Sequence, residues 1–331
     1  MRLVTYNVEW FSALFDRADR LVLDGKLSGR HGIDRATQAR ALAKVFTALD
    51  ADGIMVIEAP DTNSRQQSVR ALEHFAAEAG LRAREAISGF SNDTQQEITF
   101  LYDPDVMDAV HTPGQNDAAP RFDGVFHIDL DIDAQMDEVA FSKPPLELTV
   151  KTKGGTSLAL IGAHLKSKAP HGARTPAAVT TLSIANRRKQ LAQAIWLRRR
   201  IDQRLAEGQD LIVLGDLNDG PGLDQYEKLF NRSSVEIVMN SDLHDPHAQS
   251  LLAPRLRVLP STARFYNKET RRYFSALLDY IMLSPGLMRH QPRWRIWHPF
   301  EDAACYEDAP LREALLQASD HFPVSLDIDL P

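Results

Sequence analysis

The stretch LIVLGDLND, residues 211–219, passes from an apolar run directly into a group of polar side chains. The apolar run predicts a buried strand, and Asp216, Asn218 and Asp219 stand at its end. Burying such groups without partners would cost several kcal/mol, so they either line a crevice or form an Asx-rich turn. The stretch alone leaves both interpretations open, and the ends of the other predicted strands decide between them.

Polar side chains recur at those strand ends. Carboxylate, amide or imidazole groups stand beside apolar runs at Asn7, Glu9, Glu58, His164, Asp279, Asp320 and His321. Each group has an ordinary explanation when taken alone, such as a strand-end cap or an exposed turn residue. In layered α/β folds, however, strand ends converge on one crevice, so the whole set predicts a single polar site.

The residue types of this set suit one kind of chemistry. Oxygen atoms of Asp, Glu and Asn are hard ligands of the kind that Mg²⁺ and Mn²⁺ prefer, and the chain has a single cysteine. A divalent ion beside carboxylates and imidazoles neutralises phosphate charge, positions a water molecule and stabilises a departing oxygen. The set therefore predicts metal-assisted cleavage of phosphate esters.

The motifs that carry these residues resemble those of the endonuclease/exonuclease/phosphatase superfamily, and are closest to its bacterial nuclease-like members. The matching motifs are TYNVEW (5–10), VIEAP (56–60), GAHLKSK (162–168), GDLNDGP (215–221), LLDYIMLS (277–284) and SDHFPV (319–324). They extend over essentially the whole chain. One motif departs from the family, because Ile57 replaces the usual Gln and cannot supply its side-chain hydrogen bond.

The resemblance implies a set of metal ligands. Glu58 would be the principal ligand of Mg²⁺ or Mn²⁺, with Asn7 beside it. Glu9 would reach the ion directly or through water, and Asp320 would be a second carboxylate on the metal side.

The resemblance also implies catalytic roles. Asp216 would orient or deprotonate the attacking water, and Asn218 would hold a phosphate oxygen. His321, oriented by Asp279, would contact the phosphate or the nucleophile. His164 would stabilise the phosphate or protonate the leaving oxygen. Which histidine is the acid and which is the base stays open.

Three basic residues are further candidates for binding the substrate phosphate. FSKPPLEL (141–148) resembles a Phe-Arg-Pro-Pro-Leu stretch of the nuclease-like members, with Lys143 in place of Arg. A lysine lacks the bidentate fork of arginine, so Lys166 is the stronger candidate and Lys143 is alternatively a solvated edge residue. Arg188, or its neighbour Arg187, is the third candidate, from the motif that follows HLKSK.

Other polar clusters have a plainer interpretation. A helix carries the basic residues Arg187, Arg188, Lys189, Arg198, Arg199, Arg200 and Arg204. We expect a solvated face with some residues near acidic neighbours, and keep a DNA-binding stripe as the alternative. Lys26, Arg30 and His31 either grip substrate from a long loop or form a surface turn. His244 and His247 are too weakly patterned for a metal pair, and no aromatic-rich basic groove stands out.

The alternation of short apolar runs and helical patterns predicts a four-layered α/β sandwich, with two mixed β-sheets packed face to face and helices on the outside. We expect one domain over residues 1–331, with helices within 33–50, 63–80 and 184–207 and loops over 15–33 and 103–142. The first strand is expected within 3–10 and the last within 322–330.

Composition limits the functional classes. The chain has 331 residues and a net charge of −7, which disfavours a dedicated nucleic-acid binder but permits an enzyme with a basic cleft. Cys305 is the single cysteine, so we expect a buried bystander and no disulfide-linked partner. No signal peptide or membrane-length apolar run is visible, which favours a cytoplasmic protein without membrane insertion.

The leading hypothesis is therefore a Mg²⁺- or Mn²⁺-dependent phosphodiesterase, and specifically a nuclease acting on a phosphate-ester substrate such as DNA or RNA. The acidic net charge keeps open a phosphatase or phosphodiesterase acting on a small molecule or lipid headgroup. A catalytically silent binding protein on the same scaffold is the third hypothesis. The sequence leaves open endo or exo action and the oligomeric state.

Overall fold

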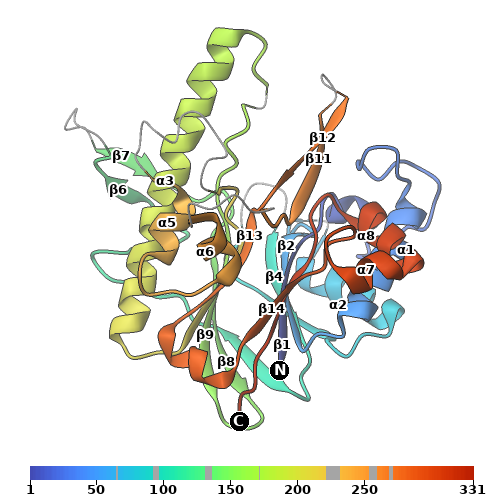
Figure 1. The fold of residues 1–331 in the computed structure, drawn as a ribbon, viewed down its shortest axis with the longest axis horizontal. Coiled ribbons are helices and arrows are strands. Elements are labelled where there is room, and N and C mark those ends of the chain that lie inside the picture. The colour runs from blue at the N-terminus through green and yellow to red at the C-terminus, as the bar shows by residue number, and fades with distance from the viewer. Residues whose placement is uncertain are drawn as a thin grey trace.

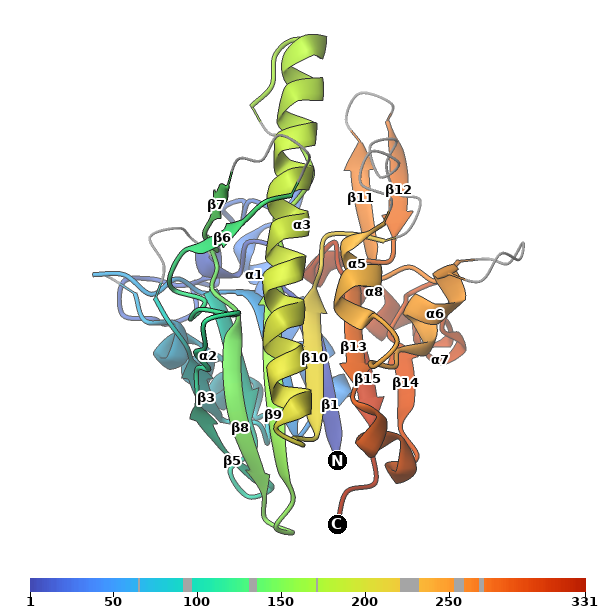
Figure 2. The same ribbon diagram turned by 90° about the vertical axis from the view of Figure 1, so that its left-hand side faces the viewer.

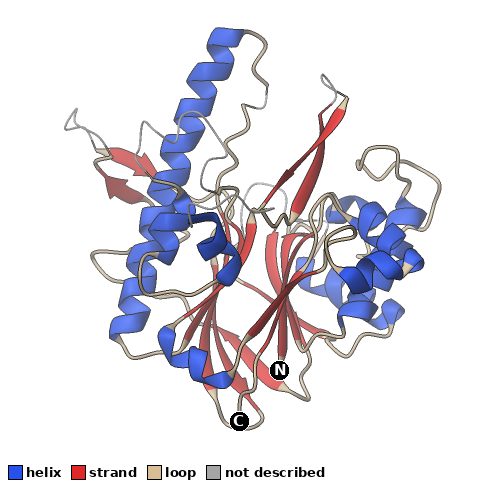
Figure 3. Ribbon diagram, viewed as in Figure 1, coloured by secondary structure: helices blue, strands red, loops and turns tan. Residues whose placement is uncertain are grey.

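Two β-sheets pack face to face with helices on both outer sides (Figures 1 and 3). The computed structural model describes residues 1–64, 66–91, 97–130, 136–170, 172–220, 232–252, 259–267 and 271–331. The expected sandwich of two mixed sheets with outer helices is confirmed.

The first sheet has six strands in the order β14-β15-β1-β2-β4-β3. Its strands are β1 (Arg2–Asn7), β2 (Gly53–Ala59), β3 (Glu85–Ser88), β4 (Glu97–Tyr102), β14 (Arg293–Ile296) and β15 (Val324–Asp327). β1 and β2 are parallel and the other neighbours are antiparallel, so the sheet is mixed.

The second sheet has five strands in the order β13-β10-β9-β8-β5. Its strands are β5 (Met107–His111), β8 (Leu146–Thr152), β9 (Ser157–His164), β10 (Leu211–Asp216) and β13 (Asp279–Leu283). β9 and β10 are parallel and the other pairs are antiparallel. Each sheet thus has one central parallel pair, β1–β2 or β9–β10.

Helices cover the outer face of each sheet. The helices are α1 (Arg35–Leu49), α2 (Ser68–Ala79), α3 (Pro176–Ala206), α5 (Ser234–Met239), α6 (Pro246–Leu252), α7 (Ala303–Glu307) and α8 (Ala309–Ala318), with 3₁₀ turns η1 (Phe11–Leu14) and η2 (Pro285–His290). α1, α2 and α8 pack on the first sheet, and α3 and α5 pack on the second. Within the described residues, no helix combines the length and the apolar character needed to cross a membrane.

Two small hairpins complete the fold. β6 (Phe126–Ile128) pairs with β7 (Asp137–Val139), and β11 (Ala263–Asn267) pairs with β12 (Arg272–Ala276). Figure 2 shows that β11–β12 and the amino-terminal part of α3 extend beyond the sheets on the same side.

The space between the sheets is filled by aliphatic and aromatic side chains. Leu3, Phe100, Leu160, Ile212 and Leu326 are among the fully buried residues of this core. Each such side chain stabilises the fold by about 1.5–3 kcal/mol relative to an exposed one. The apolar positions of the strands therefore set how the sheets face each other, and with that which strand ends meet.

The expected elements are present, with several corrections to their bounds. The first strand ends at Asn7, so Glu9 lies beyond it, and the last strand ends at Asp327. The segment 103–142, expected as loops, contains β5, β6 and β7. The second helix begins at Ser68 rather than near residue 63.

The long helix was expected from residue 184 but begins at Pro176. The Thr175 hydroxyl accepts a hydrogen bond from the Ala178 backbone N–H at 3.2 Å, and Pro176 follows in the first turn. This cap explains the earlier start, since Thr at the N-cap and Pro at the first position both favour helix initiation.

Candidate phosphate-ester site

A cleft of about 1250 Å³ lies where the two sheets meet at one end of the sandwich. Asn7 ends β1, Glu58 lies near the end of β2, His164 ends β9 and Asp216 ends β10. All four line the cleft, so the carboxyl ends of the two parallel pairs converge on it. Glu9, Lys143, Lys166, Asn218, Asp320 and His321 also line it.

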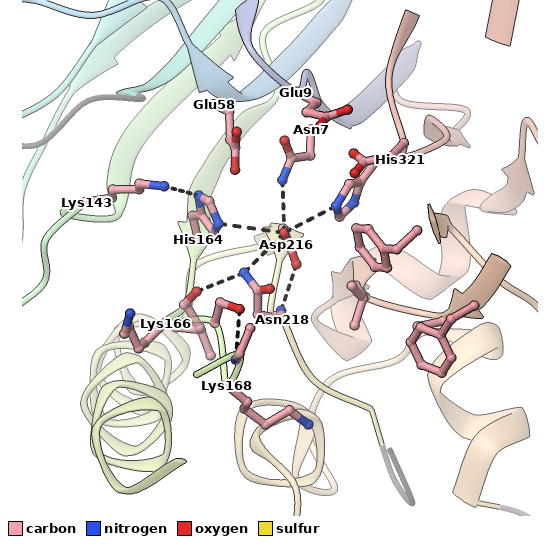
Figure 4. A pocket seen from close by; sticks show the side chains of 18 of the residues that line it. Asn7, Glu9, Glu58, Lys143, His164, Lys166, Lys168, Asp216, Asn218 and His321 are labelled. Carbon is pink, nitrogen blue, oxygen red and sulfur yellow. Dashed lines mark hydrogen bonds and ion pairs between the residues drawn. The ribbon is translucent and has the colours of Figure 1, made fainter. Parts of the chain in front are cut away.

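Asp216 lies at the centre of this arrangement (Figure 4). Its Oδ2 accepts hydrogen bonds from Asn7 Nδ2 at 3.0 Å and Asn218 Nδ2 at 3.3 Å, and its Oδ1 accepts from the Asn218 backbone N–H at 2.7 Å. His164 Nε2 and His321 Nε2 lie 3.7 and 4.0 Å from the same Oδ2. Burial and the nearby Asp279 charge raise the pKa of Asp216 to about 7.

The backbone is specialised where these side chains are held. Gly215 has φ 140°, and a Cβ there would lie 2.0 Å from the Ala163 carbonyl oxygen, so only glycine lets β10 approach β9 closely. Glu58 has φ 59° at a β-bulge between Ile57 and Ala59, and Asn218 has φ 51°. Positive φ at residues with side chains is costly and is typical of functional sites. The bulge also leaves Ile57 in the core between the sheets.

His321 is held by a carboxylate. Its Nδ1 lies 2.8 Å from Asp279 Oδ2, and the Thr262 hydroxyl donates to the same oxygen at 2.7 Å. Burial lowers the pKa of His321, but the charge and hydrogen bond of Asp279 and the charges of Asp216 and Asp320 together outweigh it, so the pKa lies well above its ordinary value. His321 is therefore an imidazolium, with Nε2–H directed at the centre of the site.

His164 has the opposite environment. Burial and the nearby positive charge of Lys143 hold the pKa of His164 well below its ordinary value, so its imidazole is neutral. Lys143 Nζ lies 3.4 Å from His164 Nδ1, and a lysine can only donate. Nδ1 is then the acceptor and the ring proton is on Nε2, facing Asp216. Lys143 is partly buried and lines the cleft, unlike the solvated edge residue of the alternative interpretation, and burial lowers its pKa.

Burial disfavours the negatively charged form of the carboxylates in the cleft. Burial raises the pKa of Glu58, and it raises the pKa of Asp320 to about 7, with the Glu9 charge adding to both. The carboxylate of Glu9 itself forms an ion pair with Arg30. A bound cation would offset this crowding of negative charge. Among the described residues, Asp216, Asp279 and His321 also have candidate ligand atoms within 4.8 Å of one another.

The basic residues of α3 have different positions from those expected. The expectation of acidic neighbours is right, since Arg187 pairs with Asp219 at 2.9 Å and Arg188 with Asp137 at 2.9 Å. The expectation of a solvated face is wrong for Arg187, Arg198 and Arg200, which are buried. Arg187 lines the cleft, whereas Arg188 is directed toward Asp137 on β7.

Other candidates of the sequence lie in ordinary surroundings. Cys305 is buried, and burial raises the pKa of its thiol to about 12, so it is unreactive. His244 Nδ1 lies 2.9 Å from Gln249 Nε2, and His247 lies beside Asp245, which caps the turn before α6. His31 of the long loop contacts the ring of Tyr266 at 5.3 Å between centroids.

The sequence motifs did not indicate two groups of residues, one behind the cleft and one lining it. Thr262 orients Asp279 through two hydrogen bonds. It lies in none of the recognised sequence motifs, so only the structure shows its role. Aromatic side chains at Trp10, Phe265, Tyr266 and Phe274 line the cleft. The signal for these was present in RFY (264–266) and RRYF (271–274), which combine aromatic and arginine residues in a short span.

Comparisons with known proteins agree with this geometry. The model of the "Endonuclease/Exonuclease/phosphatase family" matches residues 4–321. A comparison with curated protein sequences gives no significant match.

Similar solved structures share the fold at low identity. TDP2 of D. rerio in complex with single-strand DNA product has a TM-score of 0.51 and 13% identity, with 98% of this chain and 97% of that chain covered. A family protein of Bacteroides thetaiotaomicron has a TM-score of 0.53 and 16% identity, covering 100% and 98%. A mannosyl-6-phosphatase of the same organism has a TM-score of 0.51 and 16% identity, covering 100% of both chains.

Proposed function

Because this chain belongs to the endonuclease/exonuclease/phosphatase family, we propose that it is a divalent-metal-dependent phosphodiesterase, and specifically a nuclease. The main observation behind the proposal is that N–H groups of two imidazoles and two amides converge around Asp216. One of these imidazoles, His164, is neutral and the other, His321, is positively charged. The proposal takes residues 1–331 as one domain, since β1 and β15 from opposite ends of the chain pair directly.

Asp216 is the proposed base. A pKa of about 7 allows it to accept a proton from water near neutral pH, and the amides of Asn7 and Asn218 orient it. The His321 imidazolium, held by Asp279, binds the negative charge of the phosphate. The neutral His164 donates a hydrogen bond from Nε2–H to the leaving oxygen. Lys143 and Lys166 add positive charge to the same cleft.

The oxygen-rich side of the cleft fits a divalent metal ion. Asn7 Oδ1 is buried and has no hydrogen-bond partner within the described part of the chain, although the Nδ2 of the same amide is bonded to Asp216. Figure 4 shows the Glu58 carboxylate directed into the same space. We assign Asn7, Glu58 and Asp320 as ligands, with Glu9 further out because of its pair with Arg30. When bound, Mg²⁺ or Mn²⁺ would neutralise phosphate charge.

The group of Asp216, Asp279 and His321 is a poorer metal site. The closeness of Asp279 and His321 follows from their hydrogen bond at 2.8 Å. The raised pKa of His321 means that its nitrogen carries a proton and has no lone pair for a metal.

A small phosphate ester is the second candidate substrate. The net charge of −7 disfavours long-range attraction of polyanions, and a protein of similar fold is a mannosyl-6-phosphatase. A panel of sugar phosphates, inositol phosphates and lipid headgroups tests it. Turnover of one of these with nucleic acids left intact favours this candidate, and saturable binding without turnover under any divalent metal favours the silent scaffold.

The nuclease is tested by cleavage of plasmid and oligonucleotides with Mg²⁺ or Mn²⁺, with and without chelator. Wild-type protein should cleave only with metal, and Asp216→Asn and His321→Ala should lose at least about 10²-fold in kcat. Asp105→Asn is the matched control, because the Asp105 side chain is 76% exposed and pairs with Arg84 far from the cleft. Metal-independent cleavage, or full activity of Asp216→Asn, contradicts the proposal.

A further inference from the structure

The cleft has an aromatic rim. Trp10, Tyr266 and Phe274 line it and are 46%, 38% and 51% exposed. Large aromatic side chains usually lie buried, so several exposed rings around one cleft indicate a binding surface. The rim belongs to the same cleft as Asp216 and His321, which means that a ligand can contact both together.

Trp10 is held rigidly at this rim. Its Nε1–H donates to Glu9 Oε1 at 3.0 Å, and its backbone has φ 60°. Gly29 packs against the ring so closely that a Cβ there would lie 2.7 Å from Cδ2. The loop that carries Gly29 therefore supports the indole, and little conformational entropy is lost when a flat ligand stacks on its exposed part.

The β11–β12 hairpin supplies the other rings. Its register pairs Phe265 with Phe274 and Tyr266 with Tyr273, and the two tyrosine rings lie 5.2 Å apart. The Arg264 guanidinium lies 3.5 Å from the centroid of the Tyr273 ring. These contacts fix ring orientations on a hairpin that extends away from the sheets (Figure 2).

The hairpin is tied to the catalytic side chains. Ala263 forms a β-bridge with His321, and the Arg264 backbone N–H donates to the Asp320 carbonyl oxygen at 2.7 Å. The ring of Phe265 contacts that of His321 at 5.5 Å between centroids. The aromatic rim thus begins at the proposed phosphate site, and Lys143, Lys166 and Lys168 line another part of the same cleft.

We propose that the aromatic rim binds unpaired bases next to the scissile phosphate, so that the substrate is a single-stranded polynucleotide or a single-stranded end. This inference rests on the proposed nuclease function. Aromatic rings that stack bases beside cations that follow the backbone are the usual means of binding single strands. In a duplex the faces of the bases are stacked on one another and are not accessible to aromatic side chains.

The size of the cleft favours a polynucleotide over a sugar phosphate. Pockets for compact ligands enclose roughly 300–1,000 Å³, whereas this cleft encloses about 1250 Å³. Rings on two separate segments, Trp10 just before η1 and the β11–β12 hairpin, provide places for more than one base.

The test measures base-dependent binding apart from turnover. Asp216→Asn protein is titrated in Mg²⁺ with single-stranded DNA and RNA oligonucleotides, an abasic oligomer of equal length, and a blunt duplex. Trp10 is the one exposed tryptophan among the four, so its fluorescence reports on the rim. Single strands of DNA, RNA or both should quench it, the abasic oligomer should not, and Trp10→Phe in the same background should remove the signal.

Ring removal provides the second measurement. Tyr266→Ala and Phe274→Ala, each in the Asp216→Asn background, should bind single strands roughly 10-fold more weakly, with little change for the abasic oligomer. Tyr306→Ala is the matched control, because Tyr306 is 53% exposed on α7 and does not line the cleft.

The outcomes separate this inference from the nuclease proposal. Equal binding of normal and abasic oligomers, equal binding of duplex, or no loss on ring removal overturns the aromatic base site, even if wild-type protein cleaves DNA. Binding to none of the oligonucleotides also overturns it. Absence of metal-dependent cleavage by wild-type protein, with base-dependent binding intact, overturns the nuclease proposal alone.

Discussion

At the scale of single residues, Asp279 makes the largest contribution to keeping His321 charged. Asp279 Oδ2 accepts from both His321 Nδ1 and the Thr262 hydroxyl, and Thr262 also accepts the Asp279 backbone N–H at 3.0 Å. This arrangement fixes the carboxylate, whose charge and hydrogen bond oppose the effect of burial and raise the pKa of the imidazole.

Asp279→Asn should lower kcat by about 10²- to 10⁴-fold without unfolding the protein. Asp279 raises the pKa of His321, so its loss lowers that pKa and the ring loses its proton at a lower pH. The alkaline limb of the pH–rate profile should therefore move to lower pH, and thermal unfolding serves as the check on folding. An unchanged profile with an unchanged kcat contradicts the role of the imidazolium.

The identities of the central side chains could be predicted from the sequence because they stand at strand ends. Asp216, His164 and Asn7 follow apolar runs directly, and any two-sheet packing of those runs brings them together. The pairing of Lys143 with His164 could not be predicted, since no motif joins their segments. The aromatic rim could not be predicted either, because exposure of Tyr266 and Phe274 depends on a hairpin anchored through Ala263 to His321.

At the scale of elements, α3 is attached to the second sheet by a buried ion pair. Arg200 is fully buried, and its Nε lies 3.1 Å from Glu147 Oε1 on β8, which also pairs with Arg204 at 3.2 Å. The sequence suggested a polar helix face here, because the partner of Arg200 is distant in the chain. Burial of a charge is tolerated only while its partner stays in place.

Arg200→Met should lower the free energy of unfolding by about 3–5 kcal/mol, because Glu147 then lacks part of its compensation. The double variant Arg200→Met/Glu147→Leu should recover much of this loss by replacing the pair with apolar packing. Urea denaturation measures both, with Arg293→Met as control, since the exposed Arg293–Asp329 pair contributes about 0–1 kcal/mol. Equal losses in Arg200→Met and Arg293→Met contradict the assigned importance of the buried pair.

Element existence was more predictable than element length. Strand-like runs and the Asp34 cap of α1 are local signals, and both appear in the structure, with Asp34 accepting the Thr37 N–H at 2.8 Å. The amino-terminal turns of α3 lack a regular apolar stripe because they project beyond the sheets, so periodicity gave no sign of them (Figure 1).

At the scale of the whole molecule, the crowded carboxylates couple the site to stability. The pKa of Asp320 is about 7 in the folded protein, against about 3.9 in an unfolded chain. Between these values the folded state keeps a proton that the unfolded state has lost. The contribution of Asp320 to stability without metal therefore falls as pH rises toward about 7 and is constant above it.

Mg²⁺ should restore the stability that is lost as pH rises, because the ion binds deprotonated ligands. At 100 times its Kd the ion should stabilise the protein by about 2.7 kcal/mol at pH 8, and it should have little effect at pH 5. Thermal unfolding with Mg²⁺ and with chelator at each pH measures the difference. Asp320→Asn should reduce the gain at pH 8, and an equal gain at both pH values contradicts the assignment of Asp320 as a ligand.

The position of β15 has a consequence for synthesis of the protein. β15 lies between β14 and β1, and the segment before it carries Asp320 and His321. A nascent chain stopped before residue 319 leaves β1 with an open edge and lacks one of the two imidazoles. We therefore expect a chain truncated in this way to lack the proposed hydrolytic activity, which depends on β15 joining the first sheet.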